Sequence, residues 1–177
     1  MTDEFTWDTF ARLVTTDESA LAAVRQFTAD PDAYFADHED DLIQRGIEDS
    51  EEVTGAVVVI DALGKVDEVA YMGWKSPVDE VVGLLERIPR VKDTGINLEV
   101  LVEPGYPQEA DVETVVGWIN ALLADSDVTV AILDEDSDAY PLIAVPTDRA
   151  ASIAETADSL GAEVRILRAD ASEVPHA

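Results

Sequence analysis

The stretch VTVAILDEDSDAYPLIAVP, residues 128–146, decides the fold because it places two apolar runs around a short acidic segment. The runs 128–133 and 141–146 are apolar at successive positions, which is typical of strands buried on both faces of a sheet. The link between them is too short to hold a crossover helix, so the two strands should pair antiparallel. We therefore expect a hairpin at the centre of a sheet.

Residues 67–168 around this hairpin alternate between strand-like and helix-like segments. The further strand-like segments are 68–74, 96–103 and 162–167. The helix-like segments, with apolar residues at helical spacing, are 76–89, 109–124 and 147–160. Helices that connect successive strands are typical of parallel pairings. We therefore expect an α/β (α+β) fold in which a mixed sheet of about five strands has one antiparallel hairpin and helices packed on it.

The N-terminal third, residues 5–66, has the pattern of helices. Apolar residues recur at helical spacing in residues 6–14 and 18–27. Asp30 and Pro31 then form a typical helix start, an N-cap followed by proline at the first helical position. We expect this part of the chain to be mainly helical.

The segment 53–63 allows two interpretations. Its β-branched run, residues 57–60, favours a strand. Yet Ile60, Leu63 and Val66 also stand at helical spacing, which favours a helix. Residue propensity alone predicts the strand.

The number of domains can be inferred from the absence of repeats and linkers in the sequence. It has no internal repeat and no linker rich in glycine, serine or proline. We therefore expect one domain over residues 1–177, with a mainly helical part at 5–66, a mixed-sheet part at 67–168 and a frayed tail at 169–177.

Composition excludes several classes of protein. The chain has 177 residues, enough for a buried core, but no apolar run of the roughly 18 residues that a membrane span requires. Its acidic beginning, MTDEFTWDTF, is unlike a signal peptide, so we expect a cytoplasmic protein. Cysteine is absent, which excludes disulfides, thiol catalysis, zinc–thiolate sites and iron–sulfur clusters.

The net charge of -28, from 39 acidic against 11 basic residues, is the strongest global signal. Such a surface repels nucleic acid and anionic membranes, so we expect neither as a partner. One interpretation is host adaptation, in a salt-tolerant or high-GC organism that loads its soluble protein surfaces with Asp and Glu. The other is a functional acidic face that docks a basic protein partner or mimics DNA. The acidic residues are spread from Asp3 to Glu173, which favours adaptation.

The acidic turn between the hairpin strands is a candidate cation site. Asp134, Asp136 and Asp138 have the spacing of the first three ligands of an EF-hand loop. The sixth position is Ala139 instead of glycine and the twelfth is Val145 instead of glutamate, which excludes an EF-hand. A looser divalent-cation site stays open, but we prefer a turn stabilised by local Asp and Ser hydrogen bonds.

Trp74 and Lys75 form the second candidate, where a predicted strand ends and a capped helix begins. Ligands gather at such strand ends, and a lysine there could bind an anion. The alternative is structural: Lys75 would act as the counter-ion of the acidic turn. The candidate binding residues are therefore Trp74, Lys75, Asp134, Asp136, Asp138 and Tyr140.

Four motifs resemble, in this order, an uncharacterised bacterial family known as domain of unknown function 6630. They are RGIEDSEEV at 45–53, IDAL at 60–63, WK at 74–75 and LDEDSDAYPLIAVP at 133–146. The resemblance extends from about residue 45 to residue 167 and implies that the IDAL segment is helical, against its valine propensity. The family's acidic turn tends to be longer and to carry a glycine. The resemblance implies no known activity, substrate or cofactor.

Signatures of enzymes are missing. The only histidines are His38, in an acidic helical stretch, and His176, in the tail. Two histidines in such places are too few to suggest a His-based catalytic triad or a zinc site. No dinucleotide or Walker glycine pattern occurs, and we predict no cofactor, no bound metal and no catalytic residue. The expected function is that of a small acidic binding or interaction protein. The alternative is a divalent-metal-dependent hydrolase that uses Asp134, Asp136 and Asp138.

Overall fold

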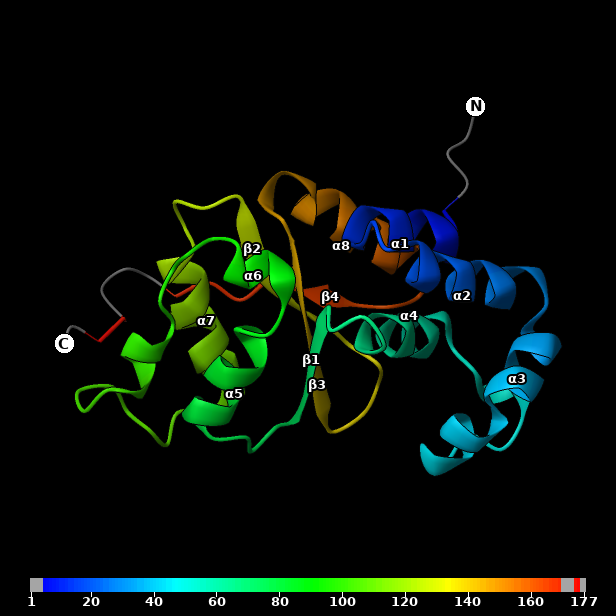
Figure 1. Ribbon diagram of the computed structural model, residues 1–177, viewed down its shortest axis with the longest axis horizontal. Helices are drawn as coiled ribbons and strands as arrows, with labels where there is room; N and C mark the ends of the chain where they lie inside the picture. The colour runs from blue at the N-terminus through cyan, green and yellow to red at the C-terminus, as the bar shows by residue number, and fades with distance from the viewer. Residues whose placement is uncertain (1–4, 170–173, 176–177) are drawn as a thin grey trace.

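A computed structural model describes residues 5–169 and 174–175 and shows a sheet with helices on both of its faces (Figure 1). The sheet has the strand order β1-β3-β2-β4. Its strands are β1 (Val69–Gly73), β2 (Val128–Leu133), β3 (Ala139–Pro146) and β4 (Val164–Arg165). The α/β class is confirmed, with one four-stranded sheet in place of the five strands expected.

The central hairpin is confirmed. β2 and β3 are the two inner strands and pair antiparallel, with Ile132 opposite Leu142. Successive residues of β2 alternate between the two faces of the sheet, and both faces are covered. For this reason the strand is apolar at every position except Thr129, which is half-buried.

The expected parallel pairings are wrong, because all pairings in the sheet are antiparallel. The helical connections do produce strands of equal direction, as the crossover argument requires. β1 and β2 both run opposite to β3, and therefore run the same way. The hairpin strand β3 lies between them, so the parallel strands are never neighbours.

The strand expected at 96–103 is also wrong, because this segment contains the 3-10 helix η2 (Glu99–Val102). Leu98 and Leu101 are completely buried, while Val100 is half-buried. A buried spacing of three residues fits a 3-10 turn, in which side chains three apart share one side. The alternation of valines and glutamates in the sequence hides this spacing.

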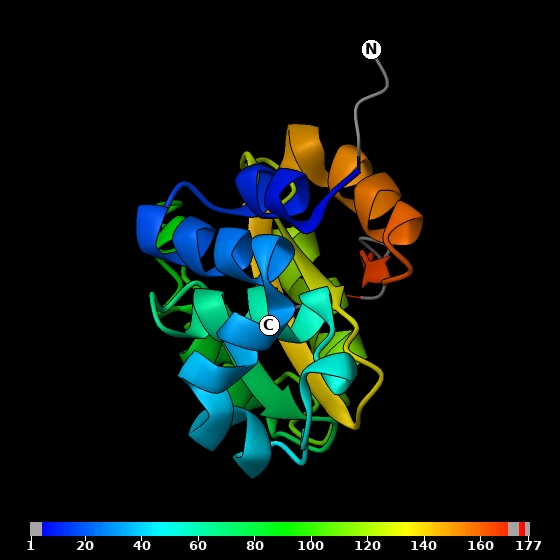
Figure 2. The same ribbon diagram turned by 90° about the vertical axis from the view of Figure 1, so that its right-hand side faces the viewer.

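The N-terminal third is helical, as expected. Its helices are α1 (Trp7–Val14), α2 (Glu18–Ala29), α3 (Pro31–Gln44), the 3-10 turn η1 (Ser50–Glu52) and α4 (Gly55–Gly64). The side chains of Asp17, Asp30 and Thr54 accept hydrogen bonds from backbone N–H groups at the starts of α2, α3 and α4. Figure 2 shows these helices in front of the sheet.

The ambiguous segment 53–63 forms the helix α4, as the family resemblance implies. Every residue from Gly55 to Ile60 is buried, so the segment is apolar on all sides. A helix that is apolar all round is a fully buried one. Burial between the other helices and the sheet therefore overrides the β-propensity of the valines.

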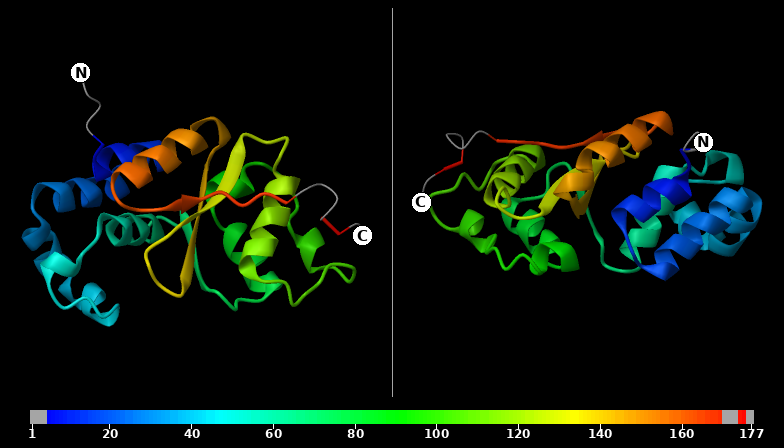
Figure 3. Two further views of the ribbon diagram at one scale, coloured as in Figure 1. Left: turned by 180° about the vertical axis from the view of Figure 1, so that it is seen from behind. Right: turned by 90° about the horizontal axis from the view of Figure 1, so that it is seen from above.

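The remaining helices lie on the opposite face of the sheet or next to β4. They are α5 (Val78–Leu85), α6 (Pro89–Lys92), α7 (Val112–Leu122), the 3-10 turn η3 (Thr147–Arg149) and α8 (Ala150–Ser159). In the view from above, α5, α6 and α7 stand on one side of the sheet, whereas α8 stands on the other side together with α1, α2 and α4 (Figure 3). The sheet therefore separates two apolar cores, one under α1, α2, α4 and α8 and one under α5 and α7.

The tail expected to fray, 169–177, lies mostly outside the described residues, as does His176. Within the described part of the chain, no helix has the length and apolar character that a membrane span needs.

Candidate functional site

The acidic segment 134–138 is a tight turn held by its own side chains. Asp136 N donates to Asp134 Oδ1 over 2.7 Å, and Ala139 N donates to Ser137 Oγ over 3.1 Å. Asp136 has a φ of 59°, a left-handed conformation that aspartate adopts more readily than most residues. The local hydrogen bonds agree with the turn interpretation of this segment.

The three aspartates of the turn do not converge. Asp134 is half-buried, whereas Asp136 and Asp138 are exposed. Among residues 5–169 and 174–175, no group of three histidine or acidic side chains is arranged to hold a metal ion. The geometry therefore gives the metal-dependent hydrolase no support.

Lys75 is not the counter-ion of the turn. Its ammonium lies 4.4 Å from the centre of the Trp74 ring, and within the described chain it forms no ion pair. The expected pairing is therefore wrong. The backbone does join the two candidates, because Trp74 N donates to Asp138 O over 3.3 Å where β1 meets the turn.

The cation that faces the turn is Arg45, at the end of α3. Its guanidinium lies 2.8 Å from Asp61 of α4 and 2.9 Å from Glu135 of the turn. The Tyr71 hydroxyl of β1 donates to the same Glu135 carboxylate, and the guanidinium lies 5.2 Å from the centre of the Tyr71 ring. We call Arg45, Asp61, Tyr71 and Glu135 the Arg45 cluster. It ties four separate elements together.

Burial governs the electrostatics of this cluster. The side chains of Glu135 and Asp61 are 3% and 20% exposed. Burial raises the pKa of Asp61, although the charge of Arg45 opposes the change. Burial acts to lower the pKa of Arg45, but Asp61 and Glu135 outweigh it and raise that pKa. The two partners thus differ. For Arg45 the attraction of the carboxylates exceeds the cost of burying its charge, whereas for Asp61 the attraction of Arg45 does not.

Tyrosines around the cluster are held in their neutral form. Burial, followed by the hydrogen bond to Glu135, raises the pKa of Tyr71. Burial, followed by the charge of Asp61, raises the pKa of Tyr34 to about 12. The Tyr34 ring stacks on His38 with ring centres 4.1 Å apart, at the residue where α3 departs from helical geometry. Both tyrosines therefore interact electrostatically with the charges of the Arg45 cluster.

A hollow of about 220 Å³ opens next to the Arg45 cluster. It is lined by His38, Asp41, Arg45, Ile60, Asp61, Gly64, Lys65, Val69 and Tyr71. Val69 and Tyr71 belong to β1, so the hollow runs along the outer side of this strand. It is a shallow, partly charged recess that could accept a side chain from a bound molecule.

Tyr140 lies away from the other candidates. Its hydroxyl donates to Glu113 of α7 over 3.0 Å, and the Arg165 guanidinium of β4 lies 2.7 Å from the same carboxylate. Arg165 is also 5.7 Å from the centre of the Tyr140 ring. The hydrogen bond from Arg165, followed by that from Tyr140, lowers the pKa of Glu113. This group joins α7 to the opposite edge of the sheet.

Sequence reasoning missed the Arg45 cluster, although a signal was present. Arg45 stands in RGIEDSEEV, Asp61 in IDAL and Glu135 in LDEDSDAYPLIAVP. These are three of the motifs on which the family resemblance rests, and the fold brings one charged residue of each into contact. Tyr71 lies outside the motifs and carries no signal of its own.

Comparisons with known proteins agree with the resemblance. No curated protein and no solved structure matches the chain. One family model does match, over residues 6–167, and it is described as a domain of unknown function (DUF6630). The match covers almost the whole chain. The protein therefore belongs to the DUF6630 family.

Proposed function

We propose that this protein is a non-catalytic interaction protein that binds a basic, extended segment of a partner protein along the outer edge of β1. The observation that carries the proposal is the unpaired edge of β1, flanked by two exposed aromatic side chains, Tyr71 and Trp74.

The backbone of β1 offers the first contact. In the described part of the chain, β1 pairs only with β3, where Tyr71 lies opposite Pro141. Hydrogen-bonded pairs alternate along an antiparallel ladder, and Trp74 N is bonded to Asp138 O. Tyr71 therefore belongs to a non-bonded pair, and its N–H and C=O point to the outer edge. An extended segment can pair with these groups as a fifth strand.

The aromatic side chains offer the second contact. The side chains of Tyr71 and Trp74 are 44% and 52% exposed. Burying such large aromatic side chains against a partner would contribute favourable free energy to binding. One cation already lies over each ring, Arg45 over Tyr71 and Lys75 over Trp74. A lysine or arginine from a partner could make the same kind of contact on the open part of either ring.

Charge supplies the selectivity. The net charge of -28 attracts basic segments and accelerates their encounter, while it repels acidic ones and further copies of this chain. The exposed Asp136 and Asp138 lie at the end of β1, and Asp67 and Glu68 lie just before its start. A basic strand on this edge would therefore have carboxylates near both of its ends.

The test uses a synthetic peptide of alternating valine and lysine, titrated into the whole protein by isothermal calorimetry. Saturable binding is expected, and Trp74→Ala should weaken it at least about tenfold, in the range of an interface aromatic anchor. Phe5→Ala is the matched control, because Phe5 is 45% exposed but belongs to the chain before α1. Its effect should stay within about twofold.

Two control peptides separate strand addition from simple charge attraction. An alternating valine–glutamate peptide should not bind. A valine–lysine peptide with proline at its centre should bind much more weakly, because proline cannot donate to the ladder. Equal binding of the proline peptide, or equal losses in Trp74→Ala and Phe5→Ala, would refute the proposal.

A further inference from the structure

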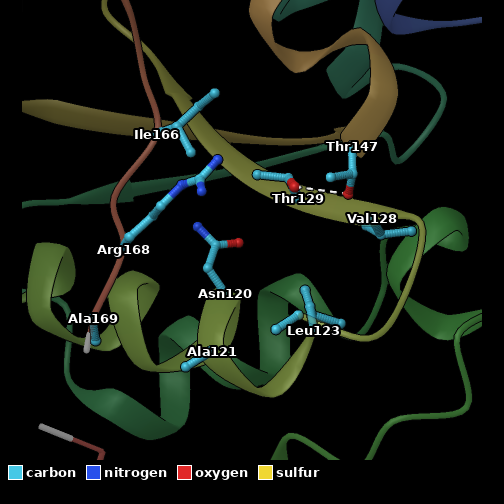
Figure 4. Close-up of a pocket in the computed structure, with 10 residues that line it drawn as sticks. Asn120, Ala121, Leu123, Val128, Thr129, Thr147, Ile166, Arg168 and Ala169 are labelled. Atoms are coloured by element: carbon cyan, nitrogen blue, oxygen red, sulfur yellow. Dashed lines mark hydrogen bonds between the residues drawn. The ribbon is translucent and has the colours of Figure 1, made fainter. Parts of the chain in front are cut away.

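A second hollow, of about 210 Å³, lies on the other side of the sheet, between α7, the start of β2 and the segment that follows β4 (Figure 4). Its apolar wall includes Leu123, Val128 and Ile166. Its polar residues include Thr129, Thr147 and Arg168. It is far from the Arg45 cluster in the fold and shares no lining residue with the hollow beside β1.

Asn120 holds two walls of this hollow together, β2 and the segment after β4. Its Nδ2 donates to Val130 O over 2.8 Å and to Leu167 O over 2.7 Å, and its Oδ1 accepts from Val130 N over 2.8 Å. The side-chain amide thus takes the place of a strand at the edge of β2 and holds the C-terminal segment beside it. The short β4 ends before this point, and Val128 and Thr129 of β2 line the hollow. Figure 3 shows the segment after β4 passing along α7.

The polar groups of the hollow are available to a ligand. Figure 4 shows the Arg168 guanidinium pointing into the space between Ile166, Thr129 and Asn120. Thr129 Oγ1 and Thr147 Oγ1 are 2.9 Å apart, so one hydroxyl donates to the other. The proton of the second hydroxyl is then free to donate outward.

Arg168, like Arg87, Arg90 and Arg149, forms no ion pair within the described residues, and of these arginines it is the one that lines this hollow. Arg12, Arg25, Arg45 and Arg165 all pair with carboxylates. A guanidinium placed over an apolar wall beside a free hydroxyl proton is suited to a carboxylate, which it can bind with two parallel hydrogen bonds.

We propose that this hollow binds a small organic carboxylate, with the carboxylate on Arg168 and the threonine hydroxyls and the short apolar body against Leu123, Val128 and Ile166. The volume suits a body of only a few carbon atoms, since pockets for larger ligands are roughly 300–1,000 Å³. Inorganic phosphate fits less well, because it carries more charge, has no apolar part and meets a single cation. This site is independent of the proposed strand addition at β1.

Butyrate is the probe, titrated into the isotope-labelled whole protein by NMR at constant ionic strength. Saturable shifts are expected for the amides of 120–130 and 166–168, and Arg168→Gln should weaken binding at least about tenfold, since it removes a charge-assisted contact. Arg149→Gln is the matched control. It removes the same charge from η3, next to Thr147 but outside the lining, and should change binding less than about twofold.

One further variant and two further ligands test whether the hollow recognises the carboxylate group of butyrate. Thr129→Val keeps the shape of the hollow and removes a hydroxyl, so it should also weaken butyrate binding. Neutral butyramide and inorganic phosphate should bind much more weakly than butyrate. The proposal is overturned if butyrate gives no saturable shifts at these amides, if butyramide or phosphate binds equally well, or if Arg149→Gln weakens binding as much as Arg168→Gln does. Unchanged Asn120 side-chain resonances would show that Arg168→Gln leaves the hollow folded.

Discussion

The Arg45 guanidinium lies 2.9 Å from the Glu135 carboxylate and thereby ties the end of α3 to the turn of the central hairpin. Both partners come from segments rich in acidic residues, and Arg45 is the cation that offsets Glu135 and Asp61 together. The contact also positions Tyr71, whose hydroxyl bonds to the same carboxylate. The outer side of β1 is therefore shaped by an ion pair between distant parts of the chain.

Arg45→Met should destabilise the protein by about 1–3 kcal/mol, because it leaves Glu135 and Asp61 partly buried without a counter-charge. Urea unfolding measures the loss. Arg12→Met is the control: Arg12 pairs with Asp8 but is 51% exposed, so its replacement should leave the stability almost unchanged. In a double-mutant cycle, Arg45→Met should cost less once Glu135→Gln is present. Strictly additive effects would contradict the pairing.

Asp61 gives a prediction for pH. Its pKa in the folded protein is raised, mainly by burial, so the folded state binds this proton more readily than the unfolded state does. The contribution of Asp61 to stability is thus greatest at low pH and is lost as pH rises through the folded-state pKa. Asn resembles the protonated form. The stability of Asp61→Asn relative to wild type should therefore increase between about pH 3 and pH 7.

The measurement for Asp61 is urea unfolding of both proteins at several pH values. Comparison of the two proteins cancels the repulsion among the other carboxylates, which changes with pH in both. A relative stability of Asp61→Asn that falls as pH rises would mean that Arg45 outweighs burial at this carboxylate.

Gly55 and Trp7 give a packing prediction. A Cβ at Gly55 would lie 2.1 Å from ring atoms of Trp7, which fills this space from α1. Gly55→Ala should therefore destabilise by about 1–3 kcal/mol, despite the better helix propensity of alanine. Gly83→Ala is the control within α5, where nothing lies within 4 Å, and it should stabilise by up to about 1 kcal/mol. Thermal or urea unfolding would show the opposite signs, and equal signs would contradict the close contact.

The acidity of the chain gives a prediction for salt. If the charge of -28 mainly opposes folding through self-repulsion, screening should stabilise the folded state. The melting temperature should then rise between low salt and about 1 M sodium chloride, where the screening length falls to about 3 Å. Sucrose at matched osmolality is the control, since it leaves charges unscreened. An unchanged or lower melting temperature in salt would argue against net repulsion.

The sequence predicts those parts of the fold that local patterns determine. The hairpin follows from two apolar runs with a short link, and α1, α2 and α7 follow from apolar residues at helical spacing. The pairings between distant strands do not follow, because nothing in the sequence of β1 indicates that β3 will lie beside it. The alternating valines and glutamates of 96–103 predict a strand, whereas the buried leucines, three residues apart, belong to a 3-10 turn.

In the candidate site, too, contacts between distant parts of the chain could not be predicted from the sequence. The sequence does not indicate that Trp74 lies next to the turn, where its N–H donates to Asp138 O. The place of Lys75 at a strand end suggests a counter-ion for the turn, but its ammonium lies over the Trp74 ring instead. Arg45 meets Asp61 and Glu135 only in the folded chain, because the three residues are far apart in the sequence and no local pattern records such contacts.

Hydrogen exchange at the Tyr71 amide tests the central claim, that β1 binds an extended partner on its outer edge. In the free protein this amide should exchange rapidly, while that of Met72, which pairs with Tyr140, should be protected. Saturation with the alternating valine–lysine peptide should slow exchange at Tyr71 at least about tenfold, because the amide becomes hydrogen-bonded. An amide that exchanges equally fast with and without bound peptide would contradict strand addition at β1.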